Sequence, residues 1–185
     1  MILVGIGGNM RSRVHGPPLR VCQAALGELE SEDISVVRRS RWYRTSPVPR
    51  SGQPWFVNGV AEIVTDLGPE ALLARLHAIE RAFGRRRGEP NAARTLDLDL
   101  LAFGPLVRTG AEAPLLPHPR LAERAFVLVP LAEFAPEWRH PATGRTVREM
   151  AAMLPSGQVV EPIPEGDPEA WNDSNLLAER RSALI

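Results

Sequence analysis

The stretch Arg94-Thr95-Leu96-Asp97-Leu98-Asp99-Leu100-Leu101 alternates polar and apolar residues with a period of two. A β-strand places successive side chains on opposite faces, so the pattern predicts a strand with a leucine face and an acidic face. The leucines suit a core, while Asp97 and Asp99 lie about 7 Å apart on the other face at the rise of a strand. Two such carboxylates repel each other and need a positive partner. A metal ion satisfies this need, and so does a structural ion-pair network with arginines.

Cations lie on both sides of this predicted strand. The preceding loop, residues 85–94, is rich in arginine. After the strand, His118 stands between two prolines, so its backbone has little freedom and its side chain suits a fixed contact to a ligand or phosphate. A solvated charge run and an exposed loop histidine are the plainer alternatives.

Upstream of the arginine loop the pattern predicts alternating strands and helices. Strands are expected over residues 2–6, 34–43 and 55–64, and helices over 19–29 and 72–83. Gly7-Gly8-Asn9 suits a tight turn with positive φ, and the three prolines of residues 45–54 predict a loop. Phe56 and Asn58 share one strand face and offer a ring and an amide to a flat polar ligand, although a structural aromatic residue is commoner.

The downstream residues predict shorter helices and a tail. Helical segments are expected over residues 121–134, interrupted at Pro130, and over 146–154. Residues 155–168 are rich in Pro, Gly and acids and predict a linker, followed by a terminal helix over 169–184. We therefore divide the chain into one domain, residues 1–154, and a C-terminal linker and tail, residues 155–185.

The composition is that of a globular domain, with 185 residues, 44% hydrophobic and 24% charged. A formal net charge of +0 favours neither nucleic acid nor an anionic membrane. All 22 basic residues are arginine, which excludes a Schiff-base or Walker-A lysine and leaves arginine, histidine, backbone amides or metal to hold a phosphate. The single cysteine, Cys22, fits a reducing cytoplasm, and the N-terminal apolar run reads as a strand and not as a signal peptide.

The two acids, the nearby arginines and His118 suit one kind of chemistry. Without a P-loop, Mg²⁺ and guanidinium groups can together neutralise a polyphosphate. Carboxylates at i and i+2 of a strand can reach a pair of metal ions about 4 Å apart. Phosphoryl transfer then needs positioning and charge compensation but no covalent nucleophile.

Six segments, taken together, form a specific pattern. They are Gly5-Ile6-Gly7-Gly8-Asn9, Tyr43-Arg44-Thr45-Ser46-Pro47, Gln53-Pro54-Trp55-Phe56-Val57-Asn58, Ile79-Glu80-Arg81-Ala82-Phe83-Gly84-Arg85, Arg94-Thr95-Leu96-Asp97-Leu98-Asp99 and Pro117-His118-Pro119-Arg120-Leu121-Ala122-Glu123-Arg124-Ala125-Phe126. In this order and at nearly these spacings they resemble the 6-hydroxymethyl-7,8-dihydropterin pyrophosphokinase family of folate synthesis. The resemblance covers about residues 1–154.

This resemblance implies a fold and a reaction. The implied fold is α+β, a ferredoxin-like βαββαβ antiparallel sheet with helices on one face and additional C-terminal helices. The implied reaction moves the β,γ-pyrophosphoryl group of MgATP to the hydroxymethyl oxygen of 6-hydroxymethyl-7,8-dihydropterin and releases AMP. We expect a cytoplasmic monomer whose partners are these small molecules, with neither nucleic acid nor membrane as a partner.

The resemblance also implies roles for individual residues. Asp97 and Asp99 would hold two Mg²⁺ ions. The implied contacts to ATP are Arg85, Arg87, Arg94, His118 and Arg124, with Leu100 near the adenine. The implied contacts to the pterin are Phe56 and Phe126 on its two faces, Asn58 at its polar edge, and Thr45 and Val48 through their backbones.

One segment departs from the family pattern. Asn91-Ala92-Ala93 stands where the family often has Trp-Gly-Pro, so the arginine loop lacks a stacking aromatic residue. This motivates a second hypothesis, a homologue that binds pterin or nucleotide without transfer, although the acids, His118 and the arginines are intact. A third is an RNA-binding module, because ferredoxin-like sheets can stack bases on aromatic residues. Zero net charge and an aromatic content of 5% weigh against it.

Overall fold

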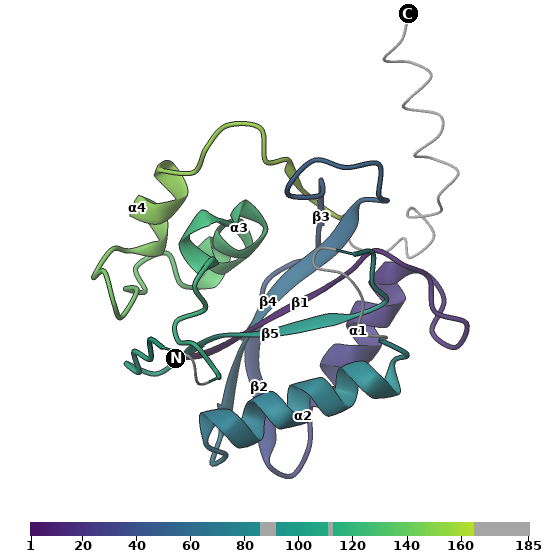
Figure 1. The fold of residues 1–185 in the computed structure, drawn as a ribbon, viewed down its shortest axis with the longest axis horizontal. Helices are drawn as coiled ribbons and strands as arrows, with labels where there is room; N and C mark the ends of the chain where they lie inside the picture. The colour runs from purple at the N-terminus through teal and green to yellow at the C-terminus, as the bar shows by residue number, and fades with distance from the viewer. Residues whose placement is uncertain (86–91, 111–112, 165–185) are drawn as a thin grey trace, which may run out of the picture.

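The computed structural model describes residues 1–85, 92–110 and 113–164 of the chain. At its centre lies a six-stranded antiparallel sheet (Figure 1) with the order β5-β1-β4-β3-β6, in which β2 also pairs with β4. The strands are β1 (Ile2–Gly8), β2 (Ile34–Arg39), β3 (Tyr43–Thr45), β4 (Phe56–Thr65), β5 (Asp97–Phe103) and β6 (Val160–Pro162). The acidic strand β5 therefore forms one edge of the sheet.

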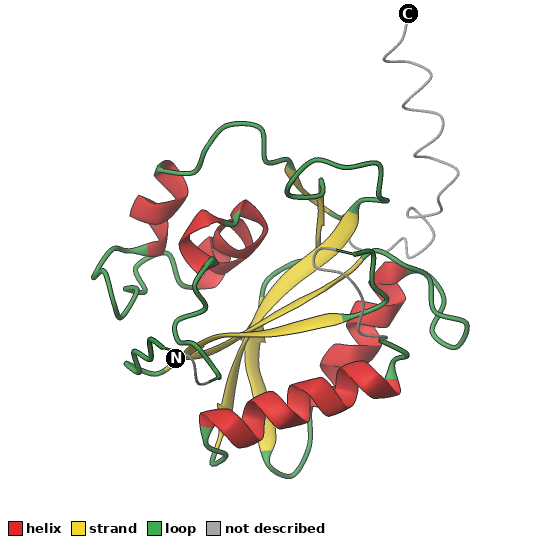
Figure 2. Cartoon of the chain, in the orientation of Figure 1, coloured by secondary structure: helices red, strands yellow, loops and turns green. Residues whose placement is uncertain are grey.

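Helices cover both faces of this sheet (Figure 2). On one face lie α1 (Pro18–Leu29) and α2 (Pro69–Ala82), and on the other lie α3 (Ala125–Phe134) and α4 (Val147–Ala152), with the 3₁₀ turn η1 (Leu121–Glu123) before α3. Two hydrophobic cores result, one between each helix pair and the sheet. Within the described ranges, no helix combines the length and the apolar character that a membrane crossing requires.

The side chains of strand β5 and of the residue before it alternate between the two faces of the sheet, as the sequence pattern predicts. The leucines at 96, 98 and 100 are at most 4% exposed and pack in the core with α1 and α2. Asp97 and Asp99 are half-buried and face the side of the sheet that carries α3. The prediction of a leucine core face and an acidic face is confirmed.

The strand begins at Asp97, three residues later than predicted. The carbonyl oxygen of Arg94 accepts hydrogen bonds from the backbone N–H groups of Asn9 and Met10, at 2.9 and 3.2 Å. Arg94 is thus tied to the turn after β1 and does not join the β1–β5 ladder. This arrangement places the end of the arginine loop beside the acidic face.

The strand predicted over residues 34–43 is two strands, β2 and β3, separated by residues 40–42. Ser40 explains the break. Its N–H donates to the carbonyl of Val60 at 2.9 Å, and its Oγ accepts from the N–H of Val60 at 3.1 Å. Because a side chain replaces a main-chain acceptor here, the regular ladder ends and β3 starts again at Tyr43.

Gly7 and Gly8 do not form the predicted turn with positive φ. They are the last residues of β1, and neither is in the left-handed region. Because these glycines have no side chain, other parts of the protein can pack directly against their main chain. A Cβ at Gly7 would lie 2.4 Å from Oδ1 of Asn58, and one at Gly8 would lie 2.3 Å from the carbonyl oxygen of Thr95.

Pro130 does not interrupt the predicted helical segment 121–134. The break lies at Arg124, whose φ of −105° and ψ of 107° separate η1 from α3, and Pro130 sits inside α3. Proline removes one N–H from the helix, but the helix continues through Pro130, which is buried.

The predicted linker over residues 155–168 contains regular structure in its described part, because residues 160–162 form β6 and pair with β3. The predicted helix over residues 169–184 lies outside the described residues.

Candidate active site

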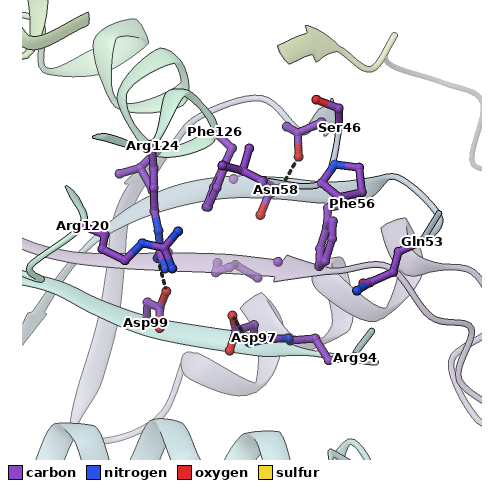
Figure 3. Close-up of a pocket in the computed structure, with 18 of the residues that line it drawn as sticks. Ser46, Gln53, Phe56, Asn58, Arg94, Asp97, Asp99, Arg120, Arg124 and Phe126 are labelled. Carbon is purple, nitrogen blue, oxygen red and sulfur yellow. Dashed lines mark hydrogen bonds and ion pairs between the residues drawn. The ribbon is translucent and has the colours of Figure 1, made fainter. Parts of the chain in front are cut away.

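The acidic face of β5 opens into a pocket of about 150 Å³ (Figure 3). Its walls come from the loop between β3 and β4, the first half of β5 and the residues that start α3. The lining residues include Thr45, Ser46, Val48, Phe56, Asn58, Arg94, Asp97, Asp99, Arg120, Arg124 and Phe126. Segments that are far apart in the sequence therefore converge on the two carboxylates.

Each carboxylate of β5 is paired with arginine. The two oxygens of Asp97 lie 2.6 Å from Nη1 of Arg85 and 2.9 Å from Nη1 of Arg94. Asp99 Oδ2 lies 3.0 Å from Nη1 of Arg124, whose side chain is only 15% exposed. The carboxylates are thus stabilised by guanidinium groups that can also bind an anionic substrate.

Asn9 fixes the position of Arg94. It is 3% exposed, and its Oδ1 accepts from the Arg94 N–H at 2.8 Å. Its Nδ2 donates to the carbonyl of Pro54 at 3.1 Å and to Oε1 of Gln53 at 3.3 Å. One amide side chain therefore joins the end of the arginine loop to the loop between β3 and β4.

Glu80 supports the acidic strand from the opposite side of the sheet. Its side chain is 5% exposed, its Oε1 accepts from the backbone N–H of Leu98 at 2.7 Å, and it forms an ion pair with Arg85. Burial raises the pKa of Glu80, while the Leu98 N–H and Arg85 oppose that shift. Because Leu98 lies between the two aspartates, Glu80 holds both β5 and one of the arginines that contact Asp97.

The wall opposite the carboxylates suits a flat polar molecule. Figure 3 shows Phe56 and Phe126 with Asn58 between them. Asn58 is 8% exposed, and its Nδ2 donates to Oγ1 of Thr45 at 2.7 Å, which fixes the direction of the amide. Gly7 leaves the space that the amide oxygen occupies.

His118 lies close enough to Asp97 and Asp99 for their charges to affect its ring. Burial lowers its pKa; Asp99 opposes this shift, while Arg124 and Arg120 reinforce it. Its Nδ1 accepts from the backbone N–H of Arg120 at 3.1 Å, so in the neutral ring the proton is on Nε2. That N–H is a donor suited to a phosphate oxygen.

Arg120 adds a further positive charge. Its side chain lines the pocket next to Arg124 (Figure 3). Among the carboxylates in the described part of the chain, none lies within ion-pair distance of Arg120. Within the described residues, the positive charge of Arg120 is therefore not compensated by a neighbouring acid.

Most of the predicted site residues converge on this pocket, although their roles stay predictions. Arg85 is connected to the pocket by its ion pair with Asp97, which lines the pocket. The side chain of Leu100 is 4% exposed in the core below the sheet, so only its main chain is available to a nucleotide. Arg87 lies outside the described residues.

Sequence reasoning assigned no site role to Asn9, Glu80, Arg120 or Gln158. Glu80 had a usable signal, because it is an acid at a core position of α2, next to the buried Ile79. Arg120 follows His118 closely enough to share its surroundings. Asn9 and Gln158 carry no local signal, since their partners are far away in the sequence.

The donor set fits Mg²⁺ bound together with a phosphate. In the described ranges no group of three or more His, Cys, Asp or Glu side chains forms a protein-only metal site. Mg²⁺ usually keeps several water ligands and is held by one or two carboxylates plus substrate phosphates. Asp97 and Asp99 line the pocket and would supply those carboxylates.

Comparison with known proteins gives a consistent result. A family model described as 7,8-dihydro-6-hydroxymethylpterin-pyrophosphokinase (HPPK) matches residues 3–136. A protein of Methylorubrum extorquens named 2-amino-4-hydroxy-6-hydroxymethyldihydropteridine pyrophosphokinase is 46% identical over 156 residues, which cover 83% of this chain and 94% of that protein. A Synechocystis protein of the same name is 43% identical over 154 residues, covering 82% of this chain and 75% of that protein.

The fold also matches a solved structure. The crystal structure of Plasmodium falciparum HPPK-DHPS A437G with STZ-DHP superposes with a TM-score of 0.63 at 13% identity. The match covers 82% of this chain but only 45% of the Plasmodium chain. At this identity the likeness concerns the fold alone.

Proposed function

Because the chain belongs to the 7,8-dihydro-6-hydroxymethylpterin-pyrophosphokinase family, we propose that it transfers a diphosphoryl group from ATP to 6-hydroxymethyl-7,8-dihydropterin. The hydroxymethyl oxygen of the pterin forms a bond to the β-phosphorus of ATP, and its O–H bond breaks with release of the proton to water. The bond between that phosphorus and the α,β-bridging oxygen breaks, and AMP leaves with this oxygen. The observation that carries the proposal is one pocket that joins an aromatic-and-amide wall to paired carboxylates and arginines.

The proposal gives Asp97 and Asp99 the role of holding two Mg²⁺ ions. When bound, these ions supply positive charge that offsets the charge of the triphosphate. Bound ions would occupy carboxylate oxygens that pair with Arg85, Arg94 and Arg124 in this structure. Guanidinium groups released from the carboxylates are then available to phosphate oxygens, with which they form bidentate contacts.

The phosphate chain has donors on two sides. Arg94 and Arg85 lie at the end of the arginine loop, and Arg124 and His118 lie at the start of α3 and the segment before it. Two of these donors are held by neighbouring groups: Asn9 accepts from the main-chain N–H of Arg94, and Nδ1 of His118 accepts from the N–H of Arg120. Groups held in position in this way need less reorganisation to stabilise a transition state.

The pterin is assigned to the space between Phe56 and Phe126. Its polar edge faces Asn58, whose amide is oriented by Thr45. Aromatic stacking and one fixed amide position the hydroxymethyl group for attack, which is the main task of the protein in this reaction.

The finer description of the fold is part of the same proposal. The strand order β5-β1-β4-β2, with α1 and α2 on one face, supports a ferredoxin-like arrangement that α3, α4 and β6 extend. A monomeric state, a cytoplasmic location and a domain boundary at residue 154 remain predictions from the sequence.

One assay tests the proposed function. The protein is incubated with ATP, MgCl₂ and 6-hydroxymethyl-7,8-dihydropterin, and AMP and the pterin diphosphate are separated by chromatography. Equal amounts of both products are expected, with no AMP when the pterin is omitted or Mg²⁺ is chelated. Folded protein that binds pterin but releases no AMP would support a binding homologue, and AMP without pterin would indicate ATP hydrolysis.

Arg120→Ala is expected to raise the KM for ATP by about 10-fold, because one charge-assisted phosphate contact is lost. The KM for the pterin should change little, since Arg120 lies with the cations of the pocket. Steady-state kinetics with each substrate varied separately measure both values. Arg148→Ala is the matched control, because Arg148 is 74% exposed and pairs with Glu137 away from the pocket. Equal effects of the two substitutions would contradict the role of Arg120.

A further inference from the structure

The segment from Gln158 to Ile163, here called the C-terminal strap, lies beyond residues 3–136, which the family model matches. It follows α4 and includes β6. Figure 1 shows that the chain after α4 runs to β3, and hydrogen bonds of Gln158 join it to the start of α3. The strap therefore reaches two of the segments that line the pocket.

The first contact of the strap is with the wall formed by Thr45 and Ser46. In the β3–β6 ladder, Thr45 is opposite Val160. Beyond the ladder, the Ser46 N–H donates to the carbonyl of Val159 at 3.2 Å, and the Val159 N–H donates to Ser46 Oγ at 3.3 Å. Both Thr45 and Ser46 line the pocket, and Thr45 orients the amide of Asn58.

The second contact is with the wall formed by Arg124 and Phe126. Gln158 Oε1 accepts from the Ala125 N–H at 2.9 Å, and its Nε2 donates to the carbonyl of Glu123 at 2.8 Å. These two backbone groups lie on either side of Arg124. Gln158 thus holds the main chain where η1 ends and α3 begins.

The helix itself provides no equivalent bond at this point. The N-cap residue of α3 is Arg124, and its side chain makes no capping hydrogen bond. A helix leaves its first N–H groups without internal partners, so an acceptor from elsewhere stabilises this end. Gln158 supplies that acceptor to Ala125 from 33 positions along the chain.

The position of Arg124 matters for the site. Its Nη1 lies 3.0 Å from Asp99, and its guanidinium carbon lies 5.3 Å from the centre of the Phe126 ring. A change in the backbone at Arg124 moves both the phosphate-binding guanidinium and the ring assigned to the pterin. Small displacements of such groups have large effects on rate.

We propose that Gln158 is a positioning residue of the substrate site, and that the strap sets the spacing between the Thr45–Ser46 wall and the Arg124–Phe126 wall. The inference rests on the proposed function for the identity of the substrate. Gln158 contacts neither ATP nor pterin in this proposal; it acts through Arg124 and Phe126.

The test compares Gln158→Ala with Gln158→Glu and with Glu161→Ala. Glu161 belongs to the same strap but pairs with Arg44, away from the start of α3, so its substitution leaves both hydrogen bonds of Gln158 in place. Gln158→Ala is expected to raise the KM for pterin and lower kcat, each by about 10-fold. Gln158→Glu keeps the acceptor for the Ala125 N–H but loses the donor to Glu123, so its values should fall between wild type and Gln158→Ala.

Amide hydrogen exchange gives a readout that does not depend on activity. Exchange at Ala125 should increase in Gln158→Ala and stay unchanged in Glu161→Ala. A lower melting temperature with unchanged KM and kcat in Gln158→Ala overturns the inference, and so does an equal rise in KM for Glu161→Ala. If the wild-type protein releases no AMP, the proposed function itself is wrong, and the substrate that Gln158 is proposed to help position is not the pterin.

Discussion

Asp99→Ala and Asp97→Ala are each expected to lower kcat on the order of 10³-fold, because each removes a carboxylate assigned to Mg²⁺ and to the phosphate chain. Removal of Asp99 also leaves the largely buried guanidinium of Arg124 without its carboxylate partner. Removal of Asp97 takes away the carboxylate that pairs with both Arg85 and Arg94, so that Arg85 keeps only its ion pair with Glu80. Each substitution therefore removes a proposed metal ligand and also disturbs the position of the arginines that pair with it. AMP release at saturating ATP and pterin measures the effect.

The same variants separate a metal site from a purely structural network. Both variants should stay folded, with far-UV circular dichroism close to wild type, because the two carboxylates are about a quarter and a third exposed and pairs of this exposure contribute little to stability. Asp99→Ala should lower the melting temperature more than Asp97→Ala, because the largely buried Arg124 loses its carboxylate partner. Asp66→Ala, in the exposed turn before α2, is the matched control. Loss of folding in Asp97→Ala or Asp99→Ala would support the structural network, and retained turnover would contradict the catalytic assignment.

Glu80→Ala is expected to lower the free energy of unfolding by about 3 kcal/mol, because it leaves the buried N–H of Leu98 without an acceptor and removes one of the two carboxylates that pair with Arg85. For a chain of this size the loss corresponds to a fall in melting temperature of roughly 6–12 °C. Thermal and urea unfolding measure it. Turnover should also fall, since Leu98 lies between Asp97 and Asp99 and Arg85 contacts Asp97.

Glu80→Gln tests which bond matters. The amide oxygen of glutamine can still accept from the Leu98 N–H, whereas the charge that pairs with Arg85 is gone. We expect a loss of about 1 kcal/mol, close to that of an ordinary hydrogen bond or a partly exposed ion pair. Equal destabilisation by Glu80→Ala and Glu80→Gln would show that the ion pair, and not the bond to β5, carries the effect.

Much of the fold could be predicted because its strongest signals are local. The alternation over residues 94–101 placed the leucines in the core and the aspartates on the other face, and Gly84 ended α2 as predicted. Local signals failed where a distant group intervened. Ser40 broke the strand predicted over residues 34–43 by bonding with Val60, and the pairing of residues 160–162 with β3 made a strand from a predicted linker.

The candidate site could be predicted in its residue types but not in its connections. Asp97, Asp99, Asn58 and Phe126 line one pocket, as the segments that resemble the pyrophosphokinase family implied. The glycines after β1 were predicted to supply positive φ, whereas they allow close approach to Asn58 and Thr95. Backbone proximity of that kind depends on strand register, which no pattern within residues 5–9 records.

The sequence alone determined that an acidic strand with a leucine face would enter the core and that cations would flank it, because side-chain periodicity and composition are properties of neighbouring residues. Only the tertiary structure decided which arginine meets which aspartate. It also decided that Asn9 holds Arg94 across 85 positions and that Gln158 caps α3 across 33. Such contacts depend on how the sheet and helices pack, and a short stretch of sequence carries no record of that packing.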